Sequence, residues 1–352
     1  MSLVVDGRVR RGDVTIEPSL RVDRGEIVAI AGPNGAGKST ALHVLAGLVR
    51  LDDGLVEIDG VAWDDGRAVA PAAERSVGAV FQDYRLFGHL SVLENVAFGL
   101  RARGTDRATA RRDAAAALER LGVRELAGRL PGDLSGGQAQ RVAMARAIVV
   151  RREVLLLDEP FAALDVSARG AIRHELERWL AEVDAYRIIV THDPVDAHAF
   201  ADRVVVMEDG LVTQHGSMSD LAAAPRSRYV ADLIGTNFLR GRLDDGALQL
   251  EGSDLTLSVG AHDAPDGPVI ATVRPAAIAL HRLEPEGTPR NVWATTVEGV
   301  DTSDGRVRVR LGAPLRLVVE VTGAGFGALD VGVGGRVWAS VKASEIDVVA
   351  DA

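Results

Sequence analysis

The sequence contains no cysteine, so it can form neither a disulfide nor a thiolate metal site. Aromatic residues make up only 4% of its 352 residues, and none precedes Trp63. No apolar run approaches the roughly 18 residues that a membrane-spanning helix needs. The first residues, MSLVVDGRVRRGD, lack the apolar core of a secretory signal. These absences are compatible with a reducing compartment and with membrane contact only through partner subunits.

Lysine is almost absent as well. Lys and Arg together number 40, but only Lys38 and Lys342 are lysines. The arginine guanidinium is a planar fork, whereas the lysine ammonium is a compact charge. We therefore expect both lysines to lie at sites where an arginine could not replace them. The net charge of −10 argues against nucleic acid as the main partner, because such binding depends on clustered cations.

Residues 1 to about 220 alternate apolar runs with helical patterns. The segments EIVAIAG (26–32), EVLLLDEP (153–160) and RIIVTHD (187–193) are continuous apolar runs that indicate buried strands. The segments 38–47 and 106–127 are helical in pattern, and we expect Gly122 to interrupt or end the second. This alternation predicts a parallel sheet covered by helices on both faces, an α/β fold.

The pattern changes at about residue 238. Short, alternating, β-branched segments such as RVRVRLG and LRLVVEVT follow, separated by Gly, Asp and Pro. They predict a small all-β barrel or sandwich. We expect a first domain at 1–235, a β-rich connecting segment at 236–287 and a small barrel at 288–352.

The segment GPNGAGKST matches the P-loop pattern G-x-x-x-x-G-K-[ST] and lies between a predicted strand and a predicted helix, as that motif requires. Its glycines let backbone N–H groups surround phosphate oxygens, and the helix N-terminus adds positive potential. We expect the lysine to reach the β- and γ-phosphates and the serine hydroxyl to bind Mg²⁺. The predicted nucleotide-binding residues are Gly32, Pro33, Asn34, Gly35, Ala36, Gly37, Lys38, Ser39 and Thr40.

Two further motifs fit a nucleotide site. A buried strand ends at Asp158, which is suited to hold Mg²⁺ through water, and Glu159 follows, suited to deprotonate an attacking water. Taken alone, this pair could equally be a solvated acidic turn. The segment LSGGQ (134–138) places Ser135 as the N-cap of a predicted helix and makes a second phosphate cradle. One P-loop already covers its own triphosphate, so this second cradle needs another nucleotide face.

The motifs together resemble those of the ABC (ATP-binding cassette) ATPases. The resemblance covers residues 1 to about 220 and includes, in family order, the P-loop, Gln82 in VFQDYRLF, LSGGQ, LLLDEP (155–160), AALD (162–165) and THD (191–193). It implies a P-loop NTPase cassette with a RecA-like core and a helical subdomain at about 83–150. It also implies that two such subunits bind two ATP molecules, with Mg²⁺, in a head-to-tail homodimer.

The resemblance also assigns roles to individual residues. It implies that Glu159 is the catalytic base and that His192 touches the γ-phosphate. Gln82 would approach Mg²⁺ and the attacking water, and Asp165 would lie at the dimer interface. Mg²⁺ would thus be held by Ser39, Gln82 and Asp158. The partner's ATP would meet Ser135, Gly136, Gly137 and Gln138.

The sequence departs from this family upstream of the P-loop. ABC ATPases usually stack the adenine on an aromatic residue there, but Val14, in RRGDVTIEP, occupies the expected position. We therefore expect an apolar contact in place of stacking, and weak discrimination between ATP and GTP. Ala162 stands where the family often has Ser, from which we expect a modest effect.

The segment FQDYRLFGHLSVLENVAFGL (81–100) is unusually apolar for a stretch that follows a loop. Half of its apolar residues can be explained as core of the helical subdomain. The alternative is a hydrophobic groove that receives a short helix of a transmembrane subunit, as in importers of this family. The apolar residues concerned are Tyr84, Leu86, Phe87, Leu90, Val92 and Leu93.

The C-terminal segments TPRNVWATTVEGV (288–300), LVVEVT (317–322) and WASVKASEI (338–346) resemble the small oxyanion-binding barrel of molybdate systems. This resemblance covers about 60 residues and implies a tetrahedral oxyanion held between adjacent barrels. Two cations with hydroxyl donors suit a dianion, but the same cations could be ordinary surface charges. The implied ligands are Thr288, Arg290, Thr322 and Lys342.

The resemblances predict the ATP-hydrolysing subunit of a molybdate or tungstate importer, peripheral at the cytoplasmic face of the membrane. Its expected partners are a second cassette, two transmembrane permease subunits and, indirectly, an external oxyanion-binding protein. The tail could sense internal molybdate or tungstate, or could serve dimerisation alone. The alternatives are an ATPase of a sulfate, iron(III) or sugar importer, and a soluble ABC ATPase of DNA repair or translation. The single cassette, the acidic charge and the β-rich tail argue against the last.

Overall fold

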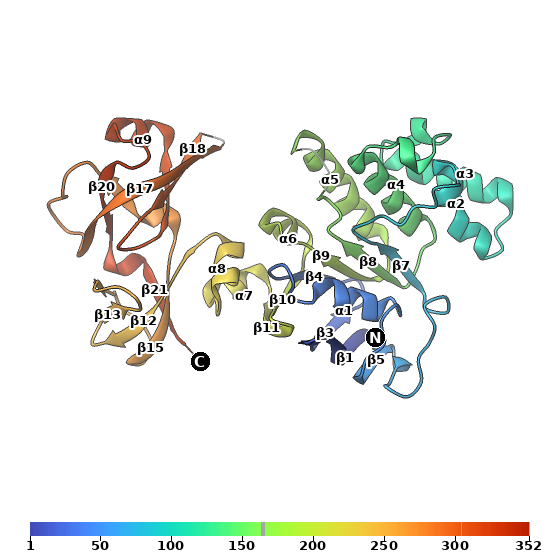
Figure 1. Ribbon diagram of the computed structural model, residues 1–352, viewed down its shortest axis with the longest axis horizontal. Helices are drawn as coiled ribbons and strands as arrows, with labels where there is room; N and C mark the ends of the chain where they lie inside the picture. The colour runs from blue at the N-terminus through green and yellow to red at the C-terminus, as the bar shows by residue number, and fades with distance from the viewer. Residues whose placement is uncertain (163–165, 304, 352) are drawn as a thin grey trace. The chain divides into compact units, whose positions relative to one another are not determined.

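A computed structural model describes residues 1–162, 166–303 and 305–351 of the chain (Figure 1). They divide into two compact units, Met1–Met218 and Ser219–Ala352. The division falls earlier than residue 235, so helix α8 (Arg228–Ile234), which ends at Gly235 with a left-handed φ of 76°, lies in the second unit. Within the described residues, no helix combines the length and apolar character needed to cross a membrane.

The first unit is organised around a six-stranded sheet of order β11-β10-β4-β9-β8-β7. All neighbours are parallel except β10 and β11, which are antiparallel. The central strands β8 and β9 are buried along their whole length, as a sheet covered on both faces requires. The predicted parallel α/β sheet is therefore confirmed. Its strands are β4 (Ile27–Ala31), β7 (Val77–Val80), β8 (Val154–Asp158), β9 (Tyr186–Val190), β10 (Arg203–Glu208) and β11 (Leu211–Gly216).

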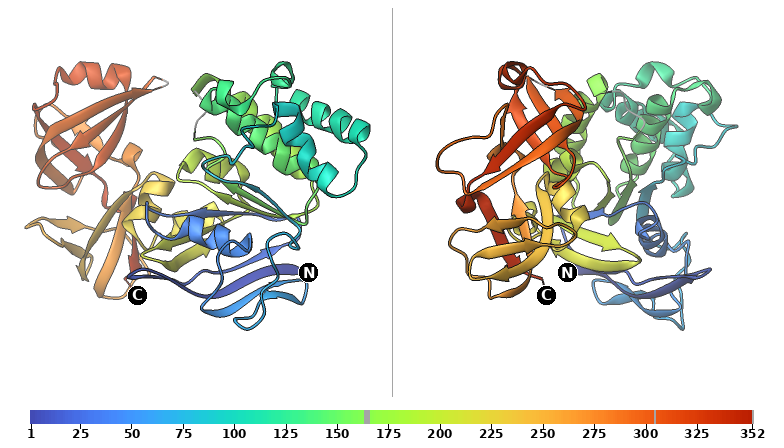
Figure 2. Two further views of the ribbon diagram at one scale, coloured as in Figure 1. Left: turned by 45° about the vertical axis from the view of Figure 1, so that its right-hand side comes forward. Right: turned by 60° about the vertical axis from the view of Figure 1, so that its left-hand side comes forward.

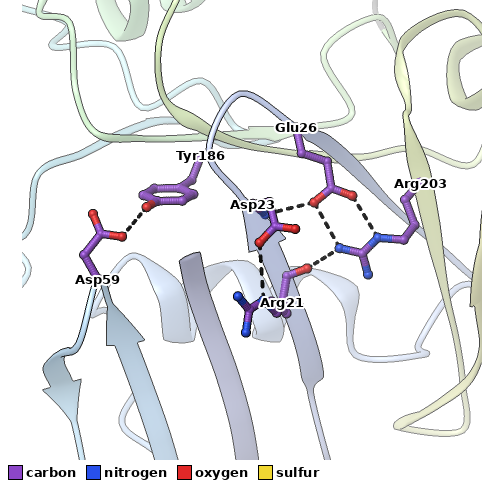
Figure 3. Close-up of polar contacts among 6 residues, drawn as sticks. All are labelled: Arg21, Asp23, Glu26, Asp59, Tyr186 and Arg203. Carbon is purple, nitrogen blue, oxygen red and sulfur yellow. Dashed lines mark hydrogen bonds and ion pairs between the residues drawn. The ribbon is translucent and has the colours of Figure 1, made fainter. Parts of the chain in front are cut away.

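A second, antiparallel sheet of the first unit has the order β2-β1-β5-β6, with β3 also paired to β1. Polar contacts connect it to the central sheet (Figure 3). The Tyr186 hydroxyl at the start of β9 donates to Asp59, which follows β5. Arg203, at the start of β10, donates to the backbone carbonyl of Arg21 on β3 and to both carboxylate oxygens of Glu26, the latter at 2.8 and 3.0 Å. The strands are β1 (Ser2–Arg11), β2 (Val14–Ile16), β3 (Ser19–Asp23), β5 (Asp53–Ile58) and β6 (Val61–Asp64).

Helices α2, α3 and α4 form a lobe beside the central sheet (Figures 1 and 2). Small residues such as Ala110, Ala114 and Ala143 are fully buried where these helices pack. The helix predicted at 106–127 is α3, and it ends at Arg120, just before Gly122 with its φ of 63°. The helices of this unit are α1 (Lys38–Leu45), α2 (Val92–Ala102), α3 (Arg107–Arg120), α4 (Gly136–Val149), α5 (Val166–Glu182) and α6 (Pro194–Phe200).

The second unit is strand-rich, as predicted, and contains two five-stranded antiparallel sheets that share one apolar core. One sheet has the order β14-β13-β12-β15-β21 and the other β16-β20-β17-β18-β19. The strands of the first sheet are β12 (Asn237–Asp244), β13 (Ala247–Leu250), β14 (Thr256–Ser258), β15 (Gly267–Val273) and β21 (Ile346–Ala350). The second sheet consists of β16 (Ala279–His281), β17 (Asn291–Ser303), β18 (Arg306–Leu311), β19 (Val318–Thr322) and β20 (Arg336–Val341). The unit also contains α7 (Met218–Ala223), α8 and α9 (Gly323–Leu329).

Strand pairing crosses the division that the sequence suggested between residues 287 and 288. The last strand, β21, pairs with β15 of the connecting segment, and β16 of that segment pairs with β20. Burial explains this pairing, because β15 reads as a nearly continuous apolar run and is buried along most of its length. Segments 236–287 and 288–352 are therefore joined through two sheets.

Candidate functional site

The P-loop lies where the sequence predicted, between β4 and α1. Position 32 has no room for a side chain, because a Cβ there would lie 2.0 Å from the carbonyl oxygen of Met207. Gly37 has a φ of 96°, and a Cβ there would lie 2.7 Å from Ile16. Both positions therefore exclude other residues, and the loop backbone approaches its neighbours closely. The loop also includes Asn34 and Gly35, which are exposed, and Thr40, which is half-buried.

Lys38 is buried, with 7% of its surface exposed. Its ammonium donates to the carbonyl oxygens of Gly32 and Pro33 at 2.7 and 2.8 Å, so it lies inside the curve of the loop. Burial lowers the pKa of Lys38, while the carboxylates of Glu159 and Asp158 oppose that shift. A compact cation beside two carboxylates and a cradle of backbone N–H groups can bind a polyphosphate.

Asp158 ends β8 and is 5% exposed. Burial raises its pKa, while a hydrogen bond with Ser39 and the charge of Lys38 act in the opposite direction. Among the described residues there is no cluster of three or more His, Asp or Glu side chains that could hold a metal alone. A carboxylate with a hydroxyl fits Mg²⁺, which takes oxygen ligands and keeps its remaining positions for phosphate and water.

Glu159 and His192 come from the ends of neighbouring parallel strands. Glu159 has a φ of 48°, a left-handed conformation that costs a non-glycine residue about 1 kcal/mol. Its N–H donates to Val190 of β9 at 3.0 Å, which fixes this turn against the next strand. The His192 Nδ1 then lies 3.0 Å from the Glu159 Oε1. A second side chain thus holds the Glu159 carboxylate in place.

The signature segment, LSGGQ (134–138), forms the capped start of helix α4. The Ser135 N–H donates to the Gln138 side chain at 3.0 Å, and the Gln138 N–H donates to the Ser135 hydroxyl at 3.4 Å. This capping box fixes the first turn of α4, in which Gly136 and Gly137 follow Ser135. Ser135 is exposed, so the helix N-terminus and its hydroxyl are open to a ligand. Gln82 is also exposed, two residues after β7.

The AALD motif (162–165) lies partly outside the described residues. Ala162 is exposed and donates its N–H to the Glu159 carbonyl at 3.2 Å. Asp165, predicted at a dimer interface, lies outside the described residues. Val14 lies on β2 and is half exposed, so an apolar side chain is presented to solvent upstream of the P-loop.

The apolar segment 81–100 is divided between core and surface. Val92 is fully buried, whereas Tyr84, Leu86 and Leu93 are only partly buried where they pack on the core of the lobe. Phe87 lies 4.6 Å, centroid to centroid, from Phe98, which is 46% exposed. Core packing therefore accounts for part of this segment, and an aromatic pair reaches the surface. Leu90 is partly buried as well.

One functional candidate was not found by the sequence analysis. Arg146 of α4 donates to the backbone carbonyls of Tyr84 and Arg85, at 2.7 and 2.6 Å. Both of those residues have left-handed φ values, 55° and 45°. Arg146 therefore fixes the loop that follows Gln82. A charged residue in an otherwise apolar helix face is the only sequence signal that could have pointed to it.

In the second unit, one of the four predicted oxyanion ligands, Lys342, lines a cavity. The cavity has a volume of about 470 Å³ and is also lined by Pro289, which precedes Arg290. In that cavity the His281 Nε2 lies 2.9 Å from the Ser340 hydroxyl, and Arg274 pairs with Glu345 at 3.1 Å. The sequence did not point to His281, Ser340, Arg274 or Glu345 as parts of a site. Of these, Ser340 is buried.

Thr322 is separated from that cavity. Thr322 on β19 lies opposite Arg306 on β18, which in turn lies opposite Ser303 at the C-terminal end of β17. Val341, which precedes Lys342, lies opposite Asn291 at the other end of β17. The Thr322 hydroxyl accepts a hydrogen bond from the Gly325 N–H at 3.0 Å and caps α9. One copy of this chain therefore does not bring Thr322 to Lys342. Thr288 and Arg290 are both exposed.

Comparisons with known proteins agree with this geometry. Residues 17–162 match the ABC transporter family, and residues 287–348 match the TOBE domain. The molybdenum import ATP-binding protein ModC of Mycobacterium tuberculosis is 42% identical over 347 residues, covering 95% of this chain and 94% of that protein. The sulfate/thiosulfate import ATP-binding protein CysA of Rhodopseudomonas palustris is 44% identical over 260 residues, or 72% of this chain and 73% of that protein.

Solved structures give the same result for the first unit. The bacterial ABC transporter cassette MJ0796, solved as a dimer, superposes with a TM-score of 0.55 at 31% identity, covering 62% of this chain and 98% of that chain. The same cassette has been solved with ADP and Pi. The structure forms the P-loop, the Glu159–His192 pair and the capped signature helix, and the identity to a known import protein extends over nearly the whole chain. This protein therefore belongs to the ABC transporter family, as an ATP-binding import subunit with a TOBE domain.

Proposed function

We propose that this ATPase drives a molybdate or tungstate importer. The observation that supports this most is the extent of likeness: identity with a molybdenum import protein runs through both units, over 95% of the chain. Likeness to a sulfate/thiosulfate import protein covers 72%. The greater extent of the molybdenum match therefore favours molybdate over sulfate. An iron(III) or sugar importer is an alternative outcome of the same test.

In the proposed mechanism, two copies of the chain bind ATP head to tail. The P-loop and Lys38 hold the phosphates of one ATP, and the signature turn beginning at Ser135 of the second copy closes over the γ-phosphate. Bound Mg²⁺ would neutralise developing phosphate charge, held by Ser39 and Asp158 with Gln82 nearby. Glu159 accepts a proton from the attacking water, and His192 positions that carboxylate.

The proposed partners are two membrane-spanning permease subunits, which place this chain at the cytoplasmic face of the membrane. The surface pair Phe87 and Phe98 supports a docking position for a permease helix, because exposed aromatic side chains are favoured at interfaces. Arg146 would hold the loop beneath this surface and so connect it to Gln82. An external oxyanion-binding protein would deliver the anion.

Transport in reconstituted vesicles tests the substrate. The chain is assembled with candidate permease subunits, and ATP hydrolysis is measured with an oxyanion-binding protein loaded with molybdate, tungstate or sulfate. We expect stimulation by molybdate and tungstate, and little by sulfate. Stimulation by sulfate alone would assign the chain to sulfate import and leave the ATPase assignment intact.

We also propose that the second unit binds the same oxyanion. Lys342 and the residues around its cavity supply cations and hydroxyl groups, which suit a dianion. Because Thr322 lies away from Lys342, a site that uses both would have to combine two copies of the chain. Titration calorimetry of the full chain with molybdate, beside a Lys342→Ala variant, tests this proposal. Equal heats from both proteins, or none from either at millimolar anion, would reject a sensor role and support a tail that serves dimerisation alone.

A further inference from the structure

Gln140 connects the signature helix to the catalytic turn. It lies on α4, two residues after the end of LSGGQ, and only 1% of its surface is exposed. Its side-chain Nε2 donates to the backbone carbonyl oxygen of Glu159 at 3.0 Å. Helix α4, which begins in LSGGQ, and the turn at Glu159 are therefore joined by one partly buried hydrogen bond.

The Glu159 backbone is held from several directions. Its N–H donates to Val190 at 3.0 Å, and its carbonyl accepts from Ala162 at 3.2 Å as well as from Gln140. The residue is in a left-handed conformation, with a φ of 48°. Such conformations persist in non-glycine residues only where the surroundings hold them. If the backbone relaxed, the carboxylate would turn away from His192.

Packing alone does not explain a glutamine at this position. The Gln140 Oε1 is buried and has no hydrogen-bond partner among the described residues. An orphaned buried acceptor destabilises a fold, and an apolar side chain of the same length would avoid it. We therefore explain the glutamine by its Nε2 group, which donates to the Glu159 carbonyl.

We propose that Gln140 is a positioning residue for catalysis, which couples the signature helix to the conformation of Glu159. Any shift of α4 would act on the Glu159 carbonyl through this hydrogen bond. The carboxylate would then reach its working position only when the signature helix is in place. This inference rests on Glu159 as the base and does not depend on which anion is transported.

The first test replaces Gln140 by Met, which keeps the side-chain length and removes both donor and acceptor. In steady-state hydrolysis by the full chain, we expect kcat to fall about tenfold while KM for ATP stays within twofold. The urea midpoint should be unchanged or higher, because the orphaned acceptor is gone. Met144→Leu, a buried substitution on the same helix, is the matched control and should keep wild-type kcat. A wild-type kcat for Gln140→Met, or an equal loss in the control, would overturn the proposal.

A second variant keeps the test decisive if Gln140→Met does not fold. Gln140→Glu retains the shape, and its carboxyl can donate to the Glu159 carbonyl only when protonated. Burial raises the pKa of a carboxyl group, so the kcat of Gln140→Glu relative to wild type should rise as the pH falls from 8 to 6. A ratio that is constant and well below one over this range would mean that a protonated donor at this position does not restore hydrolysis, and would overturn the proposal.

Discussion

The Nδ1 of His192 lies 3.0 Å from the Oε1 of Glu159, although the two residues are 33 positions apart in the sequence. The contact arises because β8 and β9 are parallel neighbours, so their carboxyl ends meet at one edge of the sheet. Glu159 is largely buried, with 18% of its side chain exposed, whereas 59% of His192 is exposed. The carboxylate is thus sheltered, while most of the imidazole is exposed to solvent.

Replacing Glu159 by Gln should separate binding from hydrolysis. The amide keeps the size of the side chain but cannot accept a proton from water, so kcat should fall by roughly 100-fold or more. ATP binding by the P-loop should persist, because Lys38 and the loop backbone are unchanged. Fluorescent nucleotide titration and phosphate release measure the two effects. Hydrolysis close to wild type would contradict the role of Glu159 as base.

His192→Ala should lower kcat without destabilising the fold. The imidazole positions the carboxylate but is mostly exposed, so we expect a loss of about tenfold in kcat and little change in the urea midpoint. His198→Ala, on α6, is the matched control and should keep full activity. Equal ATP hydrolysis by His192→Ala and His198→Ala would contradict a positioning role for His192.

The sequence predicted the local structure of each motif well, because each motif is a contiguous segment with local geometry. The P-loop, the end of β8 and the capped start of α4 depend on glycines, an N-cap and apolar runs that can be read directly. Contacts between distant segments could not be read in this way. The bond from Gln140 to Glu159 joins a helix to a strand end, and pairing of β21 with β15 joins residues about eighty positions apart in sequence. Such contacts depend on register, which no single segment determines.

Val14 should make nucleotide choice weak. It presents an apolar, half-exposed surface in place of an aromatic ring, so ATP and GTP should be hydrolysed with similar kcat/KM. Val14→Tyr should strengthen ATP binding by about three- to tenfold, since an aromatic pair adds about 1 kcal/mol. Val61→Tyr, at another exposed strand position, controls for added surface aromatics. A strong ATP preference in the unaltered chain would count against this interpretation.

The Tyr186–Asp59 contact should make stability depend on pH in the alkaline range. Burial, and then the hydrogen bond to Asp59, raise the pKa of Tyr186 to about 12. A raised pKa means that the folded state holds the proton more tightly than the unfolded state, where tyrosine titrates near about 10. Its contribution is therefore complete below about pH 10 and is lost as the pH rises toward 12.

Tyr186→Phe tests that contribution. Near pH 8 the variant should be less stable by about 1 kcal/mol, the typical worth of one buried hydrogen bond. The difference from wild type should shrink between pH 10 and 12. Urea unfolding at pH 8, 10 and 11 measures it. A difference that stays constant would show that the hydroxyl does not titrate differently in the folded state.

Substitution of Asn237 should strongly lower the folding stability of the second unit. The Asn237 side chain is 6% exposed and makes three hydrogen bonds, donating to Val273 and Val318 at 3.0 and 2.8 Å and accepting from the Val318 N–H at 2.7 Å. Because Val273 ends β15 and Val318 begins β19, one amide connects the two sheets. Asn237→Leu should therefore cost about 3 kcal/mol, since it removes bonds to buried backbone groups.

Fluorescence can follow this loss in the second unit alone. Trp293 and Trp338 lie in the second unit, so a background with Trp63→Phe and Trp179→Phe reports its unfolding in urea. Asn237→Asp is the matched comparison, because it keeps the acceptor for the Val318 N–H and removes both donors. Its stability should fall between wild type and Asn237→Leu if each bond contributes. Equal stability of all three proteins would mean that the apolar core, rather than this amide, holds the two sheets together.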